Sequence, residues 1–233
     1  MPLRGHLDSH FEQELNQLRN HILHMGGEIE KNIGDAMDCV KADNEVLARQ
    51  VIRRDHQVNC LEVDIDELCL RVLALRQPAA SDLRFITTAL KIVTDLERIG
   101  DLATNIAERC VSLRGAGRPS LVSLMLEMGR LAQEMVKSSL DAFVHRETTL
   151  AEQVIGRDRR LDELHRSAFE QVLTLMQAEP AEIPVTVNFL SIARHLERIG
   201  DHATNIAEMV VFMVRGKDIR HQWSRSERTQ GSV

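Results

Sequence analysis

One twelve-residue string occurs twice in the sequence with a single difference. ERIGDLATNIAE spans residues 97–108 and ERIGDHATNIAE spans residues 197–208. At about 100° per residue on a helical wheel, the polar residues of each copy fall on one side and the apolar residues on the other. The polar stripes contain Glu97, Asp101, Thr104, Asn105 and Glu108 in the first copy, and Glu197, Asp201, Thr204, Asn205 and Glu208 in the second. Each copy therefore predicts a helix with one core face and one acidic face.

The acidic stripes have two interpretations: a solvated helix face, or a face that does chemistry. A solvated face normally mixes signs, because carboxylates one turn apart repel by about 0.2–0.5 kcal/mol whereas a Glu to Lys pair attracts. Neither stripe contains Lys or Arg. A solvated face also tolerates most polar residues, yet these stripes are unchanged between copies, whereas residues 85–89 and 185–189 have diverged. The pattern favours the chemical interpretation.

A second helix in each half offers further oxygen ligands. Asp55 and Asn59 lie one helical turn apart, and the repeat places Asp158 and Asp162 at the same positions. Facing helices would then gather four or more side-chain oxygens, which must either raise their pKa values or bind a cation. The first copy has no His at these positions, so the expected ions are iron, manganese, magnesium or zinc held by oxygen. The predicted metal ligands are Asp55, Asn59, Glu97, Asp101 and Asn105 in the first half, and Asp158, Asp162, Glu197, Asp201 and Asn205 in the second.

Each copy of the string also contains a mid-helix glycine, Gly100 or Gly200. Glycine costs about 1 kcal/mol relative to alanine inside a helix, so the position has a use. Two compatible uses are a close helix crossing and backbone made accessible beside an ion.

Other polar residues near the strings have simpler interpretations. His195 and His202 could extend the second site, although a single helical His is more often packed or solvated. Arg98 and Arg198 flank the carboxylates, and a structural salt bridge is the expected role for both.

The spacing of apolar residues predicts an all-α fold of six long helices. We expect helices at about 7–40, 44–76, 81–114, 120–146, 149–177 and 184–215, with Asp43 and Ser81 as N-caps and Gly216 as a C-terminal cap. GAGRPS separates two halves that are further related through LARQVIRRD at 47–55 and LAEQVIGRD at 150–158. The prediction is two tandem, pseudo-symmetric three-helix bundles, at 7–115 and 120–216, and a mobile polar tail at 217–233. A chain with 3% aromatic residues and no Tyr also argues against an all-β fold.

Composition narrows the classes of partner. A net charge of -6 without a basic, aromatic-rich stripe argues against nucleic acid. Cys39, Cys60, Cys69 and Cys110 form no CxxC pair and occur only in the first half, so we expect reduced, buried thiols. No apolar stretch reaches the roughly 18 residues of a membrane span, and no signal-peptide core is present. The expectation is a cytoplasmic protein without direct membrane insertion.

The sequence resembles the PhoU family of phosphate-signalling proteins from about residue 10 to 215. The segments that carry the resemblance are LRQPAASDLRFITTALKIVTDLERIGDLATNIAE and ARHLERIGDHATNIAE. The resemblance implies two three-helix bundles, often dimeric, with metal ions at paired E/DxxxD motifs. In this chain the pairs are Asp158/Asp162 with Glu197/Asp201, and Asp55/Asn59 with Glu97/Asp101, where Asn59 departs from the acidic pattern.

The same resemblance implies a regulatory role. The family acts as an accessory to the high-affinity phosphate ABC transporter, restrains uptake, and helps a sensor histidine kinase to keep the phosphate-starvation response off. The implied partners are the ATPase subunit of that transporter, the sensor kinase and a second copy of the chain.

Our leading interpretation is a non-enzymatic, metal-binding adaptor. A metal-dependent hydrolase of phosphate esters is the first alternative, since carboxylates and cations also serve two-metal catalysis. No nucleophile, general base or phosphate-binding glycine loop stands apart from the repeat, so no catalytic residue is predicted. The second alternative is a purely structural bundle with solvated acidic stripes.

Overall fold

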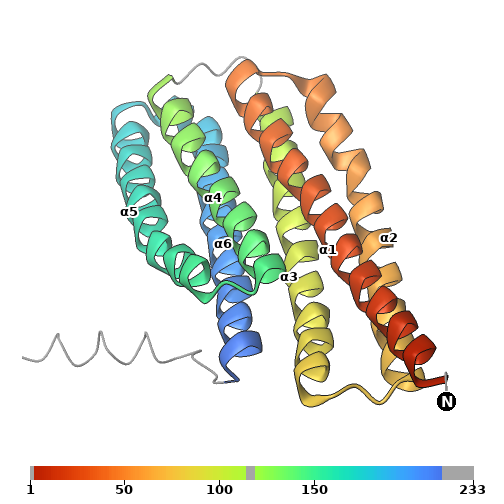
Figure 1. Cartoon of the computed structure of the whole chain (residues 1–233). Helices are drawn as coiled ribbons and strands as arrows, with labels where there is room; N and C mark the ends of the chain where they lie inside the picture. The colour runs from red at the N-terminus through yellow and green to blue at the C-terminus, as the bar shows by residue number, and fades with distance from the viewer. Residues whose placement is uncertain (1–2, 114–118, 217–233) are drawn as a thin grey trace, which may run out of the picture.

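The computed structural model describes residues 3–113 and 119–216, and these residues form six long helices with no strand (Figure 1). The helices are α1 (Leu3–Ala42), α2 (Glu45–Leu75), α3 (Ala80–Ser112), α4 (Pro119–His145), α5 (Thr148–Ala178) and α6 (Ile183–Arg215), with a short 3-10 helix at Pro180–Glu182 before α6. The predicted all-α fold is confirmed. The tail at 217–233, predicted to be mobile, lies outside the described residues.

Two of the three predicted helix caps are wrong. Asn44, not Asp43, is the N-cap of α2, and its side chain accepts a hydrogen bond from the Leu47 amide at 3.1 Å. Asp43 instead adopts a left-handed conformation at φ 51° and forms part of the turn. Helix α3 starts one residue before Ser81, after Ala79, which makes no side-chain cap bond. Gly216 ends α6 at φ 67°, as predicted for a left-handed C-terminal cap.

The two halves have the same arrangement of helices. Helix α2 packs on α1 and α3, and α5 packs on α4 and α6. The halves meet where α3 packs along α6 and α1 packs along α4. Figure 1 shows the result, with α2 and α5 at opposite edges and the other four helices between them. The predicted pair of pseudo-symmetric three-helix bundles is therefore confirmed, and the two helices that carry the repeated strings, α3 and α6, lie side by side.

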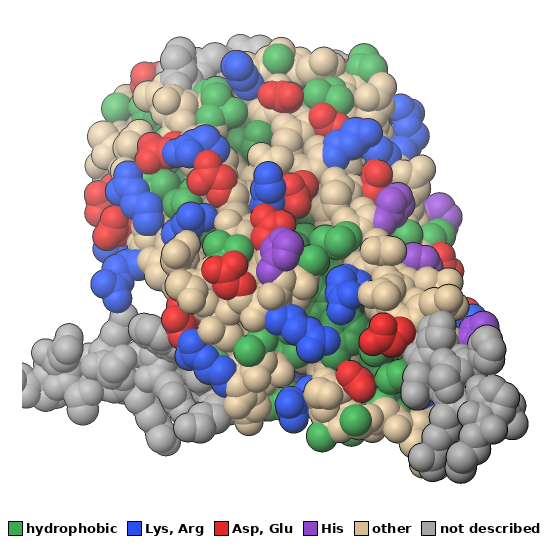
Figure 2. Space-filling model, viewed as in Figure 1, with side chains coloured by type: hydrophobic (Ala, Val, Ile, Leu, Met, Phe, Trp, Pro, Cys, Tyr) green, Lys and Arg blue, Asp and Glu red, His purple; other side chains and the backbone are tan. Residues whose placement is uncertain are grey.

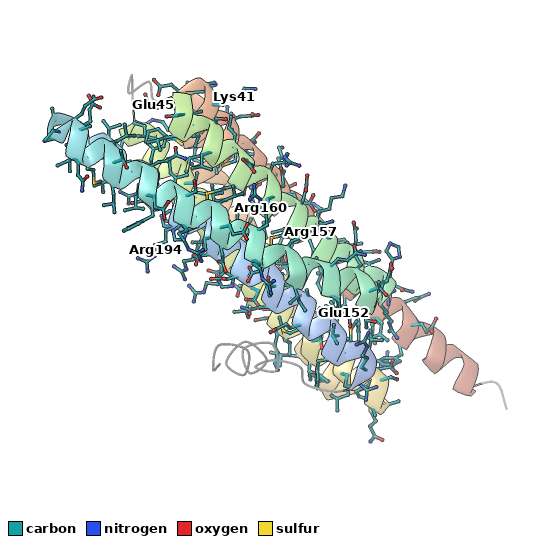
Figure 3. The ribbon with its side chains drawn as sticks, turned by 90° about the vertical axis from the view of Figure 1, so that its left-hand side faces the viewer. Lys41, Glu45, Glu152, Arg157, Arg160 and Arg194 are labelled. Atoms are coloured by element: carbon teal, nitrogen blue, oxygen red, sulfur yellow. The ribbon has the colours of Figure 1, made fainter. Side chains whose placement is uncertain are left out.

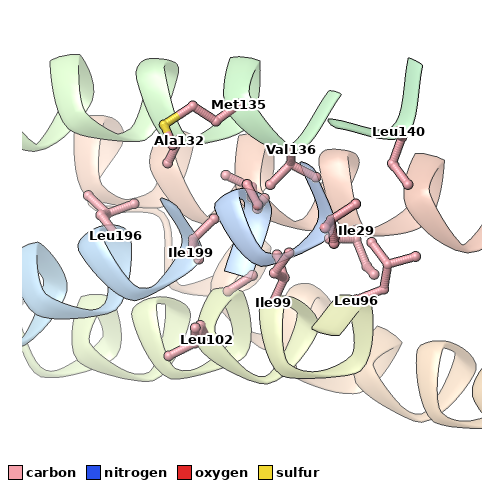
Figure 4. Packing of buried hydrophobic residues seen from close by; sticks show 14 of the residues in the cluster. Ile29, Leu96, Ile99, Leu102, Ala132, Met135, Val136, Leu140, Leu196 and Ile199 are labelled. Atoms are coloured by element: carbon pink, nitrogen blue, oxygen red, sulfur yellow. The ribbon is translucent and has the colours of Figure 1, made fainter. Parts of the chain in front are cut away.

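A single hydrophobic core runs through both halves. Ile29 of α1, Ile99 of α3, Val136 of α4 and Ile199 of α6 are all fully buried (Figure 4). Each such side chain contributes about 1.5–3 kcal/mol on burial. The apolar faces of the four central helices thus hold α3 and α6 in fixed positions. The acidic faces of α3 and α6 lie on the sides of these two helices that adjoin α2 and α5, respectively.

The cysteine prediction is correct for three of the four thiols. Cys39, Cys69 and Cys110 are buried, whereas Cys60 is exposed on α2. Burial raises the pKa of Cys69 and of Cys110 to about 12, so these two thiols stay protonated. All four cysteines are free.

Within the described part of the chain, no helix has both the length and the apolar character that crossing a membrane requires.

Candidate functional site

Each mid-helix glycine lies at a close approach between the two helices that carry carboxylates. A Cβ atom at Gly100 of α3 would lie 3.2 Å from Val58 Cγ1 of α2, and one at Gly200 of α6 would lie 2.3 Å from Leu161 Cδ2 of α5. Both glycines are buried. These short distances support the interpretation of the glycines as points of close helix crossing. The other interpretation, that glycine leaves the backbone accessible to a bound ion, stays a prediction. The crossings bring the acidic faces of neighbouring helices next to each other.

The first acidic site lies between α2 and α3. We define it as Asp55, Asn59, Glu62, Asp66, Glu97, Asp101 and Thr104. Thr104 Oγ1 donates a hydrogen bond to Asp55 Oδ1 at 3.2 Å, and Asn59 Nδ2 donates to Asp55 Oδ2 at 3.3 Å. Asn59 Oδ1 is buried and accepts no hydrogen bond from the described residues. Among its described residues, the site therefore contains one buried acceptor oxygen without a partner.

Burial, and after it the crowding of like charges, raises pKa values in this site. Partial burial is the largest cause for both Glu97 and Asp101, followed by the charge of Asp101 on Glu97 and that of Asp55 on Asp101. Arg98 opposes both shifts, with ion pairs of 3.5 Å to Glu97 Oε2 and 3.7 Å to Asp101 Oδ2. The salt bridge predicted for Arg98 is confirmed, although 58% exposure of its side chain makes it weak.

Two members of the first acidic site were missed by the sequence reasoning, Glu62 and Asp66 of α2. Burial raises the pKa of both. The charge of Asp66 further raises the pKa of Glu62, and the charge of Glu62 adds to the rise in the pKa of Glu97. A usable signal was present, because residues 55, 59, 62 and 66 follow helical spacing and share one face of α2.

The second acidic site lies between α5 and α6. We define it as Asp158, Asp162, Glu197, Asp201 and Thr204. Burial, then the charge of Asp162, raises the pKa of Asp158. Burial, then the charges of Glu197, Asp158 and Asp162, raises the pKa of Asp201 to about 6, even though much of this side chain is open to water. The nearby Thr204 hydroxyl lowers the pKa of Asp158. The Thr204 Oγ1 atom is buried and forms no well-aligned hydrogen bond with the described residues.

Several predicted ligands lie away from these sites. Asn205 Nδ2 donates to Asp95 Oδ1 of α3 at 3.4 Å, and His202 Nδ1 lies 2.7 Å from the same oxygen. Both α6 side chains thus contact the other half of the molecule. Asn105, the counterpart of Asn205, is half-buried on α3. The Nδ1 atom of His195 is buried and has no partner among the described residues.

The charge of the two acidic sites differs from that of the general surface. On the face shown in Figure 2, Lys and Arg are interspersed with Asp and Glu. In each acidic site, carboxylates of two helices instead lie near enough to raise one another's pKa values. Across residues 3–113 and 119–216, no three His, Cys, Asp or Glu side chains converge as a ready-made metal-ligand set. The donor atoms are nevertheless hard oxygens, including the unpartnered Asn59 Oδ1, and oxygen ligands are the type that Mg²⁺, Mn²⁺ and iron accept.

Comparisons with known proteins cover almost the whole chain. The model of the PhoU domain matches residues 22–110 and again residues 125–210. The chain is 43% identical over 220 residues to the phosphate-specific transport system accessory protein PhoU homolog of Pseudomonas aeruginosa, covering 94% of this chain and 91% of that protein. It is 36% identical over 220 residues to the accessory protein PhoU of Escherichia coli, covering 94% and 91%.

Solved structures agree with this assignment. The crystal structure of PhoU from Pseudomonas aeruginosa superimposes with a TM-score of 0.86 at 43% identity, over 89% of this chain and 100% of that one. The regulatory protein PhoU from Streptococcus pneumoniae superimposes with a TM-score of 0.84 at 28% identity, over 89% and 98%. The PhoU domain matches once in each half, and the two halves share one fold and one acidic stripe. These matches show that the chain belongs to the PhoU family.

Proposed function

We propose that the protein is an accessory protein of a phosphate transport system and a negative regulator of phosphate uptake and of the phosphate-starvation response. The observation that carries the proposal is the match over nearly the full length of both chains with relatives named for that accessory role. Acting in the cytoplasm as a homodimer, it would contact the ATPase subunit of the ABC transporter and the sensor histidine kinase. Its action is differential binding, in which the adaptor favours the off state of each partner.

Metal binding is the second part of the proposal. In the first acidic site the ion would be held by Asp55, Asn59, Glu97 and Asp101, and in the second by Asp158, Asp162, Glu197 and Asp201. Raised pKa values in both sites support this, because a cation would stabilise the charged form of carboxylates that are partly buried and close to one another. Iron, manganese, magnesium or zinc would neutralise these carboxylates, and the side chains would then tie α2 to α3 and α5 to α6.

Partner capture tests the coupling between metal and regulation. Wild type and the double variant Asp101→Ala/Asp201→Ala are purified from cells grown at high and low phosphate, and the recovered proteins are compared. We expect the transporter ATPase and the kinase with wild type at high phosphate, and less of both with the double variant. The matched control is Asp38→Ala/Glu170→Ala, which removes one exposed carboxylate from each half outside the two sites. Equal recovery in every case would refute the metal-coupled adaptor.

The alternatives have separate tests. Elemental analysis of protein purified without added metal distinguishes the metal-binding adaptor from a purely structural bundle: absence of any ion at stoichiometric level, with melting unchanged by chelator, favours the bundle. Turnover of generic phosphate esters with Mn²⁺ or Fe²⁺ that is lost in Asp201→Ala would favour a hydrolase.

A further inference from the structure

A pocket of about 540 Å³ opens between α5 and α6, next to the second acidic site. Its basic lining consists of His165 from α5, and of Arg194 and Arg198 one turn apart on α6. Glu197 and Asp201 line the side that adjoins the second acidic site. Figure 3 views this side of the molecule, with Arg194 on the outer edge of α6. Cations and carboxylates therefore occupy neighbouring parts of one concave surface.

The first half lacks the basic part of this surface, although it has the same twelve-residue string. At the position of His165 it has Glu62, and at the position of Arg194 it has Thr94. The surroundings of the string are thus acidic in the first half and basic in the second. Because the acidic stripe of the string is unchanged, the difference in its surroundings points to a ligand of opposite charge bound beside the second acidic site only.

The arginines of the pocket are available to a ligand. In the first half, Arg98 forms ion pairs of 3.5 and 3.7 Å with two carboxylates of its own helix. Arg194 and Arg198 form no ion pair with any residue that the structure describes, so the salt bridge predicted for Arg198 is wrong. Their positive charge acts on a neighbouring imidazole. Burial is the largest cause that lowers the pKa of His195, and the charges of Arg109, Arg198 and Arg194 lower it further. Two unpaired guanidinium groups at a pocket wall are a typical arrangement for binding a phosphate group.

The remaining lining of the pocket is apolar, and the pocket as a whole is large. Phe169, 45% exposed, and the partly buried Leu190 line it, whereas the counterpart of Phe169 in the first half is Asp66. The volume falls within the range of about 300–1,000 Å³ that holds whole small molecules, and far exceeds that of an isolated tetrahedral anion. An exposed aromatic ring beside two arginines fits a ligand with an aromatic part and an anionic part.

We propose that this pocket binds a small phosphate ester that carries an aromatic group. The phosphate accepts hydrogen bonds from Arg194 and Arg198, and the aromatic group packs against Phe169. The inference goes beyond the proposed function and does not require a metal, although a cation at Asp201 would attract the same phosphate. The first half, with Glu62, Asp66 and Thr94 at the equivalent positions, has no such site.

Titration calorimetry on the full chain tests the proposal, with adenosine monophosphate (AMP) and inorganic phosphate as probes. We expect saturable binding of AMP that is tighter than that of inorganic phosphate. Arg194→Thr, which installs the residue of the first half, weakens both by about tenfold or more, the effect of losing a charge-assisted hydrogen bond. Phe169→Ala weakens AMP binding alone. The matched control is Arg49→Thr, which removes an exposed, Glu45-paired arginine near the start of α2, outside the pocket, and leaves both affinities unchanged.

Circular dichroism confirms that each variant keeps its helical fold, so a loss of binding is not a loss of structure. The proposal is overturned by the absence of saturable AMP binding at millimolar concentration, by Arg194→Thr behaving as Arg49→Thr does, or by equal affinity for the two probes that Phe169→Ala leaves unchanged. Each titration is run with chelator and with Mn²⁺. AMP binding in chelator supports the pocket even if no metal binds, and metal binding without AMP binding refutes the pocket alone.

Discussion

His202 of α6 reaches across the molecule to Asp95 of α3, where its Nδ1 atom lies 2.7 Å from Asp95 Oδ1. Both side chains are only 17% exposed. The corresponding residue of the first half is Leu102, 4% exposed in the core. The one residue that differs between the two strings therefore forms a polar contact between the halves that has no counterpart at Leu102, and so departs from their pseudo-symmetry.

Replacement of His202 by leucine, the residue of the other string, should destabilise the junction between the halves. We expect the free energy of unfolding to fall by about 1–2 kcal/mol, because the largely buried Asp95 carboxylate loses the closer of its two partners on α6 and keeps only the longer contact with Asn205. Urea unfolding of His202→Leu, Asp95→Ala and the double variant provides the measurement. The effects should be less than additive, since both changes remove one contact. Strict additivity would show that the two side chains do not interact.

The carboxyl group of Asp201 should make the metal-free protein less stable as pH rises. Its pKa is about 6 in the folded chain and about 3.9 when unfolded. Between these values the folded state binds more protons than the unfolded state, so the free energy of unfolding falls from about pH 4 to above pH 6. With chelator present, wild type should therefore show a steeper loss of Tm between about pH 5 and pH 7.5 than Asp201→Asn, which cannot titrate. An equal or shallower loss in wild type would contradict this.

Conversion of Asn59 to aspartate should make the first acidic site depend on a cation. The change removes the donor to Asp55 and adds a like charge, so we expect the chelated protein to lose about 1–2 kcal/mol of unfolding free energy. Mn²⁺ should restore the loss and stabilise Asn59→Asp more than it stabilises wild type, because ion binding to the folded state adds to stability.

The reverse exchange in the second half, Asp162→Asn, is the matched comparison and should reduce the stabilisation by Mn²⁺. If Mn²⁺ shifts Tm equally in wild type and both variants, neither residue takes part in cation binding.

The close crossing at Gly200 should tolerate a methyl group poorly. A Cβ atom there would lie 2.3 Å from Leu161 Cδ2, and Leu161 is only 1% exposed, so Gly200→Ala should lose about 1–3 kcal/mol by overpacking, reduced by the gain in helix propensity. Gly156 on α5 has open space around it, and Gly156→Ala should gain about 0.5–1 kcal/mol. Urea unfolding of both variants measures the difference. Equal stabilisation of both would show that α5 and α6 do not approach closely at Gly200.

The helices could be predicted from the sequence because apolar residues recur at helical spacing over long segments. Helix caps were harder to predict, since a cap depends on the backbone angles of one residue as well as on its type. Asp43 and Asn44 are both good capping residues, and only the left-handed conformation of Asp43 assigns the cap to Asn44.

The acidic sites could be predicted only in part, because repetition marks only the residues that occur in both halves. Identity between the two strings pointed to Glu97 and Asp101, because these residues recur in the second half. Glu62 and Asp66 do not recur, and a search for repeated residues passes over them even though they share a helix face with Asp55. The contact between His202 and Asp95 depends on how α3 and α6 pack, which no spacing along the chain reveals.

The continuous hydrophobic core bears on how a chain with two similar halves could arise by duplication. The faces of α3 and α6 that meet at the centre are largely apolar, so a chain of half this length would display one such face to water. It would bury that face by pairing with an identical copy of itself. Joining the two copies into one polypeptide keeps the paired arrangement, and it also frees each copy to change separately, as the leucine and histidine at positions 102 and 202 have done.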